Sequence, residues 1–254
     1  MRARPLRSFT AALCWGAAAT AVPLALALAQ ALAQAAPLAH SVPDTMAQRV
    51  QACTTCHGKE GVASNQGYLP RIAGKPAGYL YNQLLNFRDG RRGNATMSSL
   101  VDNLSEDYLM EIASHFASRD LPYPPPPATS ATRANRATAQ ELARGEVLVK
   151  LGDAGRRLPA CVQCHGQAMT GVAPAIPGLL GLPQDYLLAQ LGAWRTGLRK
   201  TASPDCMSQV VARMSPEDIG AAASWLASRP VPGDGKPVAR SRSPLPLECG
   251  SAPP

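Results

Sequence analysis

Two pentapeptides of the form Cys-x-x-Cys-His carry the clearest chemical signal in the chain. They are Cys53-Thr54-Thr55-Cys56-His57 and Cys161-Val162-Gln163-Cys164-His165. Two thiols one helical turn apart can form thioether bonds to both vinyl groups of one haem, and the imidazole that follows can bind its iron. We therefore expect two covalently bound haem c groups, with Cys53, Cys56, Cys161 and Cys164 as attachment points and His57 and His165 as axial iron ligands.

Zinc binding and dithiol redox chemistry also use paired cysteines, but both fit these motifs less well. A structural zinc site needs four ligands, and neither motif has a fourth ligand at the spacing of a zinc finger. A thioredoxin-like pair belongs in a strand–helix–strand unit, which the residues around the motifs do not indicate.

The second axial ligand of each iron is expected to be a methionine. Met97 and Met207 follow their histidines by 40 and 42 residues, each in a loop between two expected helices and each before a serine. A thioether favours ferrous iron and raises the potential. The other histidines are weaker candidates, because His40 lies in the leader region and His115 aligns with Trp225. The methionines without a methionine at the matching position are expected to be core or surface residues: Met46, Met110, Met169 and Met214.

The two motifs are part of a longer internal duplication. The segment 78–84 matches 185–191, the segment 87–92 matches 194–199, and Met97-Ser98 matches Met207-Ser208, while the offset changes from 107 to 110. Such a repeat predicts two similar domains, and the Pro-rich stretch between them is typical of a semi-rigid linker. We predict a signal peptide over 1–36, a first haem-binding domain over 37–120, a linker over 121–136, a second haem-binding domain over 137–229 and a Pro-rich tail over 230–254.

Helical patterns fill both predicted domains. Thr45 with Gln48, and Thr138 with Glu141, have the spacing of capping boxes, and Ser215 can cap the last helix. Apolar residues recur at helical spacing at matching positions of the two halves, which favours core-facing helices. Alternating apolar and polar runs typical of strands are lacking, so an all-α fold is predicted.

The first residues have the pattern of an export signal. Arg2, Arg4 and Arg7 precede a long uncharged stretch rich in Ala and Leu, with a small-x-small cleavage pattern at 33–35. We expect a periplasmic protein, with an uncleaved membrane anchor as the alternative. The formal net charge of +8 decreases once the leader arginines and the haem propionates are counted. Basic blocks with interleaved aromatics are lacking, so no nucleic-acid partner is expected.

Several residues are expected to support the irons. The carbonyls of Pro70 and Pro177 lie 13 and 12 residues past the histidines, where they can accept the second imidazole proton. Cys206 and Cys249 remain after the motifs are assigned and are expected to form a disulfide, unless Cys206 binds the second iron as a thiolate. Four arginines either pair with haem propionates or lie at solvated helix ends: Arg88, Arg92, Arg195 and Arg199.

Together these segments resemble the dihaem class I cytochromes c of the c-four type, which consist of two cytochrome c domains in tandem. The resemblance covers about Thr45 to Arg229 and rests on both haem motifs, the Tyr-Leu-x-x-Gln-Leu helices, the aromatic-Arg-x-Gly-x-Arg segments and the Met-Ser pairs. It implies electron transfer in the periplasm between a quinol-oxidising membrane complex and terminal oxidases or reductases. The chain departs from the pattern at Cys206, in a three-residue insertion before Met207, and in its tail.

Three functions are compatible with these observations. The favoured one is an electron carrier, not an enzyme, with redox proteins as partners and no small-molecule substrate. The second is a dihaem oxidoreductase that oxidises thiosulfate or reduces a peroxide, with Cys206 as a thiolate ligand. The third is a haem subunit of a dehydrogenase complex. The symmetry of the two motifs favours the carrier.

Overall fold

The computed structural model describes residues 44–63, 68–125, 137–240 and 244–252 of the 254-residue chain. The chain divides into two units, Met1–Pro43 and Asp44–Pro254. The predicted signal peptide, His40, and most of the predicted linker therefore lie outside the described residues. Within the described part, no helix is both long enough and apolar enough to span a lipid bilayer.

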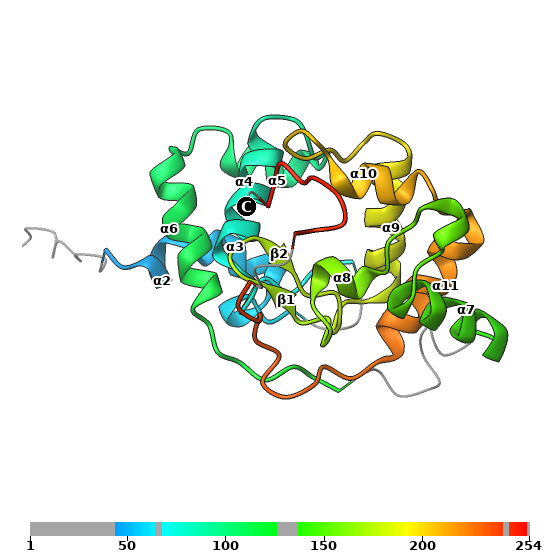
Figure 1. The fold of residues 1–254 in the computed structure, drawn as a ribbon. Helices are drawn as coiled ribbons and strands as arrows, with labels where there is room; N and C mark the ends of the chain where they lie inside the picture. The colour runs from blue at the N-terminus through cyan, green and yellow to red at the C-terminus, as the bar shows by residue number, and fades with distance from the viewer. Residues whose placement is uncertain (1–43, 64–67, 126–136, 241–243, 253–254) are drawn as a thin grey trace, which may run out of the picture. The chain divides into compact units, whose positions relative to one another are not determined.

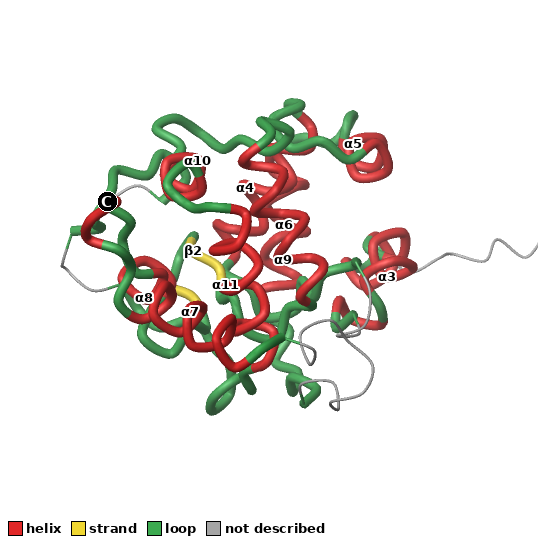
Figure 2. The backbone as a smooth tube through the Cα atoms, turned by 90° about the vertical axis from the view of Figure 1, so that its right-hand side faces the viewer, coloured by secondary structure: helices red, strands yellow, loops and turns green. Residues whose placement is uncertain are grey.

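Helices dominate both halves of the unit Asp44–Pro254 (Figures 1 and 2). The first half contains five α-helices and one 3-10 turn in its described residues: α2 (Met46–Arg49), α3 (Gln51–His57), η1 (Lys59–Gly61), α4 (Ala77–Arg88), α5 (Ala95–Val101) and α6 (Glu106–Ala117). The second half has five matching α-helices, but its 3-10 turn precedes the motif helix instead of following it. The elements are α7 (Ala139–Lys150), η3 (Ala154–Arg156), α8 (Cys161–His165), α9 (Gln184–Arg195), α10 (Cys206–Val211) and α11 (Pro216–Ser228).

The only strands among the described residues form a small antiparallel pair, β1 (Gly171–Val172) and β2 (Ile176–Pro177). This pair lies between α8 and α9, and has no counterpart in the described residues of the first half. The all-α prediction is confirmed, since each strand is only two residues long.

Side-chain caps explain where several helices begin. Thr138 and Glu141 form the predicted capping box of α7, in which the Thr138 hydroxyl accepts from the Glu141 amide and the Glu141 carboxylate accepts from the Thr138 amide. Thr45 accepts only from the Gln48 amide, so α2 has half of the predicted box. Ser215 caps α11 and Pro216 occupies its first turn, as predicted.

Each half has an apolar core of its own. In the first half, one cluster surrounds Phe116 and a second surrounds Leu109. The second half has a larger cluster that includes Leu148, Val211 and Leu226. The clusters of the first half share no residue with the cluster of the second half, which agrees with the two-domain architecture that the duplication predicts. The exact domain boundaries stay predictions.

A glycine allows α7 and α11 to pack closely in the second half. A Cβ added at Gly145 would overlap the carbonyl oxygen of Ala221 and would lie 2.7 Å from the Cβ of Trp225. The backbone of α7 therefore contacts α11 directly. Residues of both helices contribute to the core of the second half.

Short backbone contacts join the two halves. The Gly93 amide donates to the Leu198 carbonyl at 3.0 Å, and the Lys200 amide donates to the Arg91 carbonyl at 2.7 Å. A third bond runs from the Gly78 amide in α4 to the Pro174 carbonyl at 3.0 Å. The first two bonds join the repeated Arg-x-Gly-x-Arg segments, so the duplicated sequence meets its own copy at this junction.

Candidate functional site

The first Cys-x-x-Cys-His motif occupies helix α3. Cys53 is partly buried and Cys56 is exposed, and neither forms a disulfide. His57 ends the helix with a buried side chain, and its Nδ1 lies 2.8 Å from the carbonyl oxygen of Pro70. Because a carbonyl can only accept, Nδ1 donates the proton and Nε2 presents a lone pair suited to iron.

The second motif repeats this geometry in helix α8. Cys161 and Cys164 are partly buried and form no disulfide, and His165 is buried at the helix end. The His165 Nδ1 donates to the carbonyl oxygen of Pro177 at 2.7 Å, and Pro177 is held in turn by the β1–β2 pair. Both predicted proline contacts are confirmed, and such contacts fix the ring orientation of a metal-binding histidine.

The surroundings of both histidines favour the neutral imidazole. Burial lowers the pKa of His57, against the opposing effect of its hydrogen bond to Pro70, and the positive charge of Arg92 lowers it further. Burial lowers the pKa of His165 in the same way. A neutral imidazole is the form that binds a metal.

The thiols do not have the surroundings of a redox dithiol. Burial raises the pKa of Cys53 and Cys164, and it raises the pKa of Cys161 to about 12. A reactive dithiol needs the opposite shift, because the thiolate is the nucleophile. The zinc alternative lacks support too, since no three His, Cys, Asp or Glu side chains in the described part form a metal-binding group.

Met97 and Met207 lie in short helices, and the prediction that each lies in a loop is wrong. Asn94 caps α5 by accepting from the Met97 amide at 2.9 Å, and Asp205 caps α10 by accepting from the Ser208 amide at 3.0 Å. These caps give seven-residue and six-residue segments enough stabilisation to form a helical turn. Both methionine side chains are half-buried at the edge of the core of their own half.

The other methionines and His115 take the positions predicted for them. Met214 and Met169 are buried in the core of the second half, while Met110 is 40 % exposed and Met46 packs against the core of the first half. His115 lies in α6, where its ring packs edge-on against Phe116 with the ring centroids 5.2 Å apart.

Arg88 and Arg195 are the last residues of α4 and α9, as the helix-end alternative expects, and both bind protein groups there. Arg195 donates to the Met214 carbonyl at 2.7 Å, and Arg88 donates to the aligned Leu104 carbonyl at 3.4 Å. Arg88 also pairs with Asp89 and with Glu106. The two arginines therefore tie α4 and α9 to the loops that precede the last helix of each half.

Four buried cations indicate a site for anionic groups. Arg71, Lys75, Arg92 and Arg199 are between 4 and 8 % exposed, and none of them pairs with a carboxylate of the described residues. Buried charges without counter-charges are costly. Two haems carry four propionates, which would supply the missing negative charge, so these residues fit the cofactor that the motifs predict.

Arg92 and Arg199 form the centre of a polar cluster at the junction of the halves. Arg92 donates to Gln83 of its own half at 2.8 Å and to Tyr186 and Gln190 of the other half at 2.9 and 2.6 Å. Arg199 donates to Gln190 of its own half and to Gln83 of the other half, at 2.7 and 2.9 Å. The Nε of Arg199 is buried without a hydrogen-bond partner. It is therefore free to donate to a propionate.

Arg71 and Lys75 were not predicted from the sequence. The repeat gave no signal for them, because Gly178 and Leu182 lie at the matching positions of the second half. Arg71 lies 4.0 Å above the ring of Tyr123, and Lys75 donates to the Gly178 carbonyl at 3.3 Å. Their burial appears only when the halves and the segment at 121–123 are packed together.

Cys206 and Cys249 form a disulfide with a Cα–Cα distance of 4.9 Å. The predicted disulfide is confirmed. The alternative, in which Cys206 binds the second iron as a thiolate, is wrong, because the Cys206 sulfur is already bonded to Cys249. The oxidoreductase that depended on this thiolate loses its proposed ligand.

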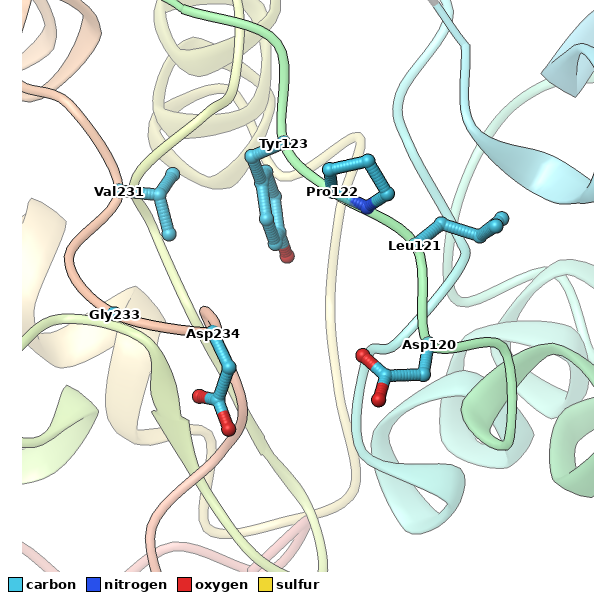
Figure 3. A pocket seen from close by; sticks show the side chains of 7 residues that line it. All are labelled: Asp120, Leu121, Pro122, Tyr123, Val231, Gly233 and Asp234. Atoms are coloured by element: carbon cyan, nitrogen blue, oxygen red, sulfur yellow. The ribbon is translucent and has the colours of Figure 1, made fainter.

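One pocket, which no residue of the haem motifs lines, lies between the segment that leaves α6 and the tail (Figure 3). Its volume is about 250 Å³. Two carboxylates at its edge, those of Asp120 and Asp234, are bridged by Lys236 at 2.7 and 3.8 Å. The remaining lining residues are Leu121, Pro122, Tyr123, Val231 and Gly233. This lining offers no group suited to haem chemistry.

Comparison with known proteins finds relatives that match most of the chain. A protein from Thiomonas intermedia (strain K12), named thiosulfate dehydrogenase electron acceptor, is 34 % identical over 208 residues, which cover 82 % of this chain and 91 % of the relative. A cytochrome c4 from Pseudomonas aeruginosa is 32 % identical over 193 residues, with 74 % and 90 % covered. No protein-family model matches the chain.

A solved structure shares the arrangement of helices. It is a thiosulfate dehydrogenase from Marichromatium purpuratum, with a TM-score of 0.58 and 32 % sequence identity. The match covers 70 % of this chain but only 36 % of that protein. This chain therefore corresponds to about one third of the larger protein.

Proposed function

Since the chain belongs to the cytochrome c4 family and binds two covalent haem c groups, we propose that it accepts electrons from a thiosulfate dehydrogenase in the periplasm. The protein then passes these electrons, one at a time, to a partner in the respiratory chain. One observation carries the haem assignment: the same helix-borne motif occurs twice, each with a buried histidine that donates to a proline carbonyl.

We assign the four motif cysteines to haem attachment, and one histidine and one methionine to each iron. His57 and Met97 are the axial ligands in the first half, and His165 and Met207 are those in the second half. Two six-coordinate irons would leave no open position for a substrate, as expected for a carrier. The proposal is supported by the half-buried methionines at matching positions of the two cores.

Each haem supplies a one-electron iron couple when it is bound. The proline carbonyls hold the imidazole rings, and the thioethers of Met97 and Met207 would favour the reduced iron. Arg92 and Arg199 would offset the propionate charges at the junction of the halves. The protein groups thus set ligand orientation and local charge, and no group of the chain has to transfer a proton or an atom.

The proposed donor is supported by the relatives. The relative from Thiomonas intermedia is named as an electron acceptor of thiosulfate dehydrogenase, and the similar solved structure is itself a thiosulfate dehydrogenase. An oxidation that releases two electrons needs an acceptor with room for two, and two haems that accept one electron each provide this. Export to the periplasm is supported by the leader pattern at Arg2, Arg4 and Arg7.

The test is a rapid-mixing experiment with the oxidised holoprotein, a purified thiosulfate dehydrogenase and thiosulfate. We expect both haems to become reduced only when enzyme and thiosulfate are both present. Reduction by thiosulfate alone would contradict the carrier and would indicate catalysis by the chain itself. No reduction in the complete mixture, with a dye confirming that the enzyme is active, would rule out this donor.

A permanent haem subunit of a dehydrogenase is the second candidate. It is supported by the solved structure, in which the similar region makes up only about one third of a thiosulfate dehydrogenase. Purification of the chain from its own cells separates the two candidates. A carrier is expected to elute alone, whereas a subunit is expected to elute with the dehydrogenase at a fixed ratio.

A further inference from the structure

The C-terminal tail returns to the start of helix α10. Cys249 is joined to Cys206, the first residue of that helix, across 43 residues of sequence. The next residue, Gly250, donates its amide to the Pro204 carbonyl at 2.9 Å. A Cβ at Gly250 would overlap the Ser203 carbonyl oxygen and would lie 2.7 Å from the Ala202 carbonyl oxygen. The tail therefore lies directly against the backbone that leads into α10.

The same tail also contacts the first half. The Asn82 side chain in α4 donates to the Ser251 carbonyl at 2.9 Å, and Ala252 is 6 % exposed. The Ala252 amide donates to the Cys249 carbonyl at 3.0 Å, which closes a turn over these residues. The tail segment 249–252 thus connects the start of α10 with α4.

The two methionine helices are restrained differently. In the first half, the Ser98 hydroxyl donates to the Phe87 carbonyl at 2.9 Å and ties α5 to α4. Ser208 occupies the matching position in α10, but among the described residues its hydroxyl makes no such bond. The segment from Arg195 to Met207 is also three residues longer than the matching segment from Arg88 to Met97. A longer loop costs more entropy to order.

The disulfide is attached to α10, the helix that lacks the serine hydrogen bond found in α5. Thr96 occupies the position in the first half that corresponds to Cys206. Cys206 precedes Met207 directly, so a covalent bond at Cys206 limits how far the backbone of Met207 can move. The Asp205 cap restrains the same turn through the Ser208 and Thr201 amides.

We infer that the Cys206–Cys249 disulfide is a positioning device that keeps the Met207 thioether on the second iron and so maintains the potential of that haem. The inference rests on the proposed ligation by Met207. The two methionines are then restrained by different contacts. The Ser98 hydrogen bond restrains the helix of Met97, and the disulfide to the tail restrains the helix of Met207.

The test compares the holoprotein with the double variant Cys206→Ser/Cys249→Ser. Ferric haem with a methionine ligand has a weak far-red absorption band, and each haem contributes about half of it. We expect the double variant to lose about half of the band and to show a lower potential for one haem only. A band of full amplitude with two unchanged potentials would overturn the inference.

Two further variants keep the test decisive. Met207→Ala should remove about half of the band whatever the disulfide does. If it does not, the proposed ligation by Met207 is wrong and the inference that rests on it fails as well; if it does, while the double variant keeps the full band, only the positioning role of the disulfide is wrong. If the double variant does not fold, Gly250→Ala takes its place, because it displaces the tail by steric overlap while both cysteines remain. It should weaken the band of the same haem, and an unchanged band in this variant would count against the inference.

Discussion

Asp218 joins three elements of the second half and offers a quantitative test of how that half is held together. Its carboxylate accepts from Arg156 at 2.6 Å and from Arg144 at 2.9 Å, and it also accepts from the Ser215 amide at 3.1 Å. Arg144 belongs to α7, Arg156 precedes the second haem motif, and Ser215 caps α11. The Asp218 side chain is only 7 % exposed.

These bonds stabilise the ionised carboxylate. Burial alone would raise the pKa of Asp218, but the hydrogen bonds from Arg156, the Ser215 amide and Arg144 outweigh it and lower the pKa from 3.8 to about 2. At about 1.4 kcal/mol for each pKa unit, the difference corresponds to about 2 kcal/mol of folding stability. Because the folded-state pKa is the lower one, this stabilisation is fully present above about pH 4 and is lost as the pH falls through about 2.

The assay is urea unfolding of the holoprotein and of Asp218→Asn, followed by far-ultraviolet circular dichroism at pH 7 and pH 3. We expect the variant to be less stable by about 2 kcal/mol at pH 7. At pH 3 the difference should fall to about half, because the native protein has then lost about half of this contribution. Glu217→Gln is the matched control, since Glu217 is the exposed neighbour of Asp218 and its removal should change stability far less. An equal difference at both pH values would refute the reasoning.

Two other variants test the ligand and the packing. Met97→Ala should keep covalent haem in the first half but lower the potential of that haem, because the thioether is removed. Met110→Ala is the control: it changes a 40 % exposed side chain and should leave both potentials unchanged. If potentiometric titration of Met97→Ala gave unchanged potentials, the assignment of Met97 as a ligand would be wrong. Gly145→Ala should lower the free energy of unfolding by about 2 kcal/mol, because the added Cβ would overlap the Ala221 carbonyl. Gly192→Ala is the control, because a Cβ at this helical position would meet open space, and it should leave stability unchanged or raise it. If thermal unfolding showed the same loss of stability in both variants, close packing of α7 on α11 would not be the cause.

Local patterns predicted much of the fold. The capping box at Thr138 and the cap at Ser215 depend on residues three positions apart, and the sequence contains the whole interaction. The proline carbonyls at Pro70 and Pro177 could be predicted because the duplication placed them at similar distances from the two histidines. Repeated local signals were therefore reliable guides.

Contacts between distant segments could not be predicted in the same way. Lys75 is buried by a segment about 100 residues away, and its sequence surroundings do not indicate this. Arg88 and Arg195 lie at matching positions, and the sequence left open whether they contact propionates or end their helices; their bonds to loop carbonyls could not be predicted from either alternative. The helices that carry Met97 and Met207 were missed because they are short and depend on caps, not on a long apolar pattern.

The central claim is that the chain carries electrons on two haems, each bound by one histidine and one methionine. The measurement that tests it most directly is a spectroelectrochemical titration of the exported holoprotein, which follows the haem bands and the far-red band of methionine-bound ferric iron. The account predicts two high-potential one-electron waves, each accompanied by loss of its share of that band on reduction. A high-spin haem, or a low-potential wave without the band, would contradict it.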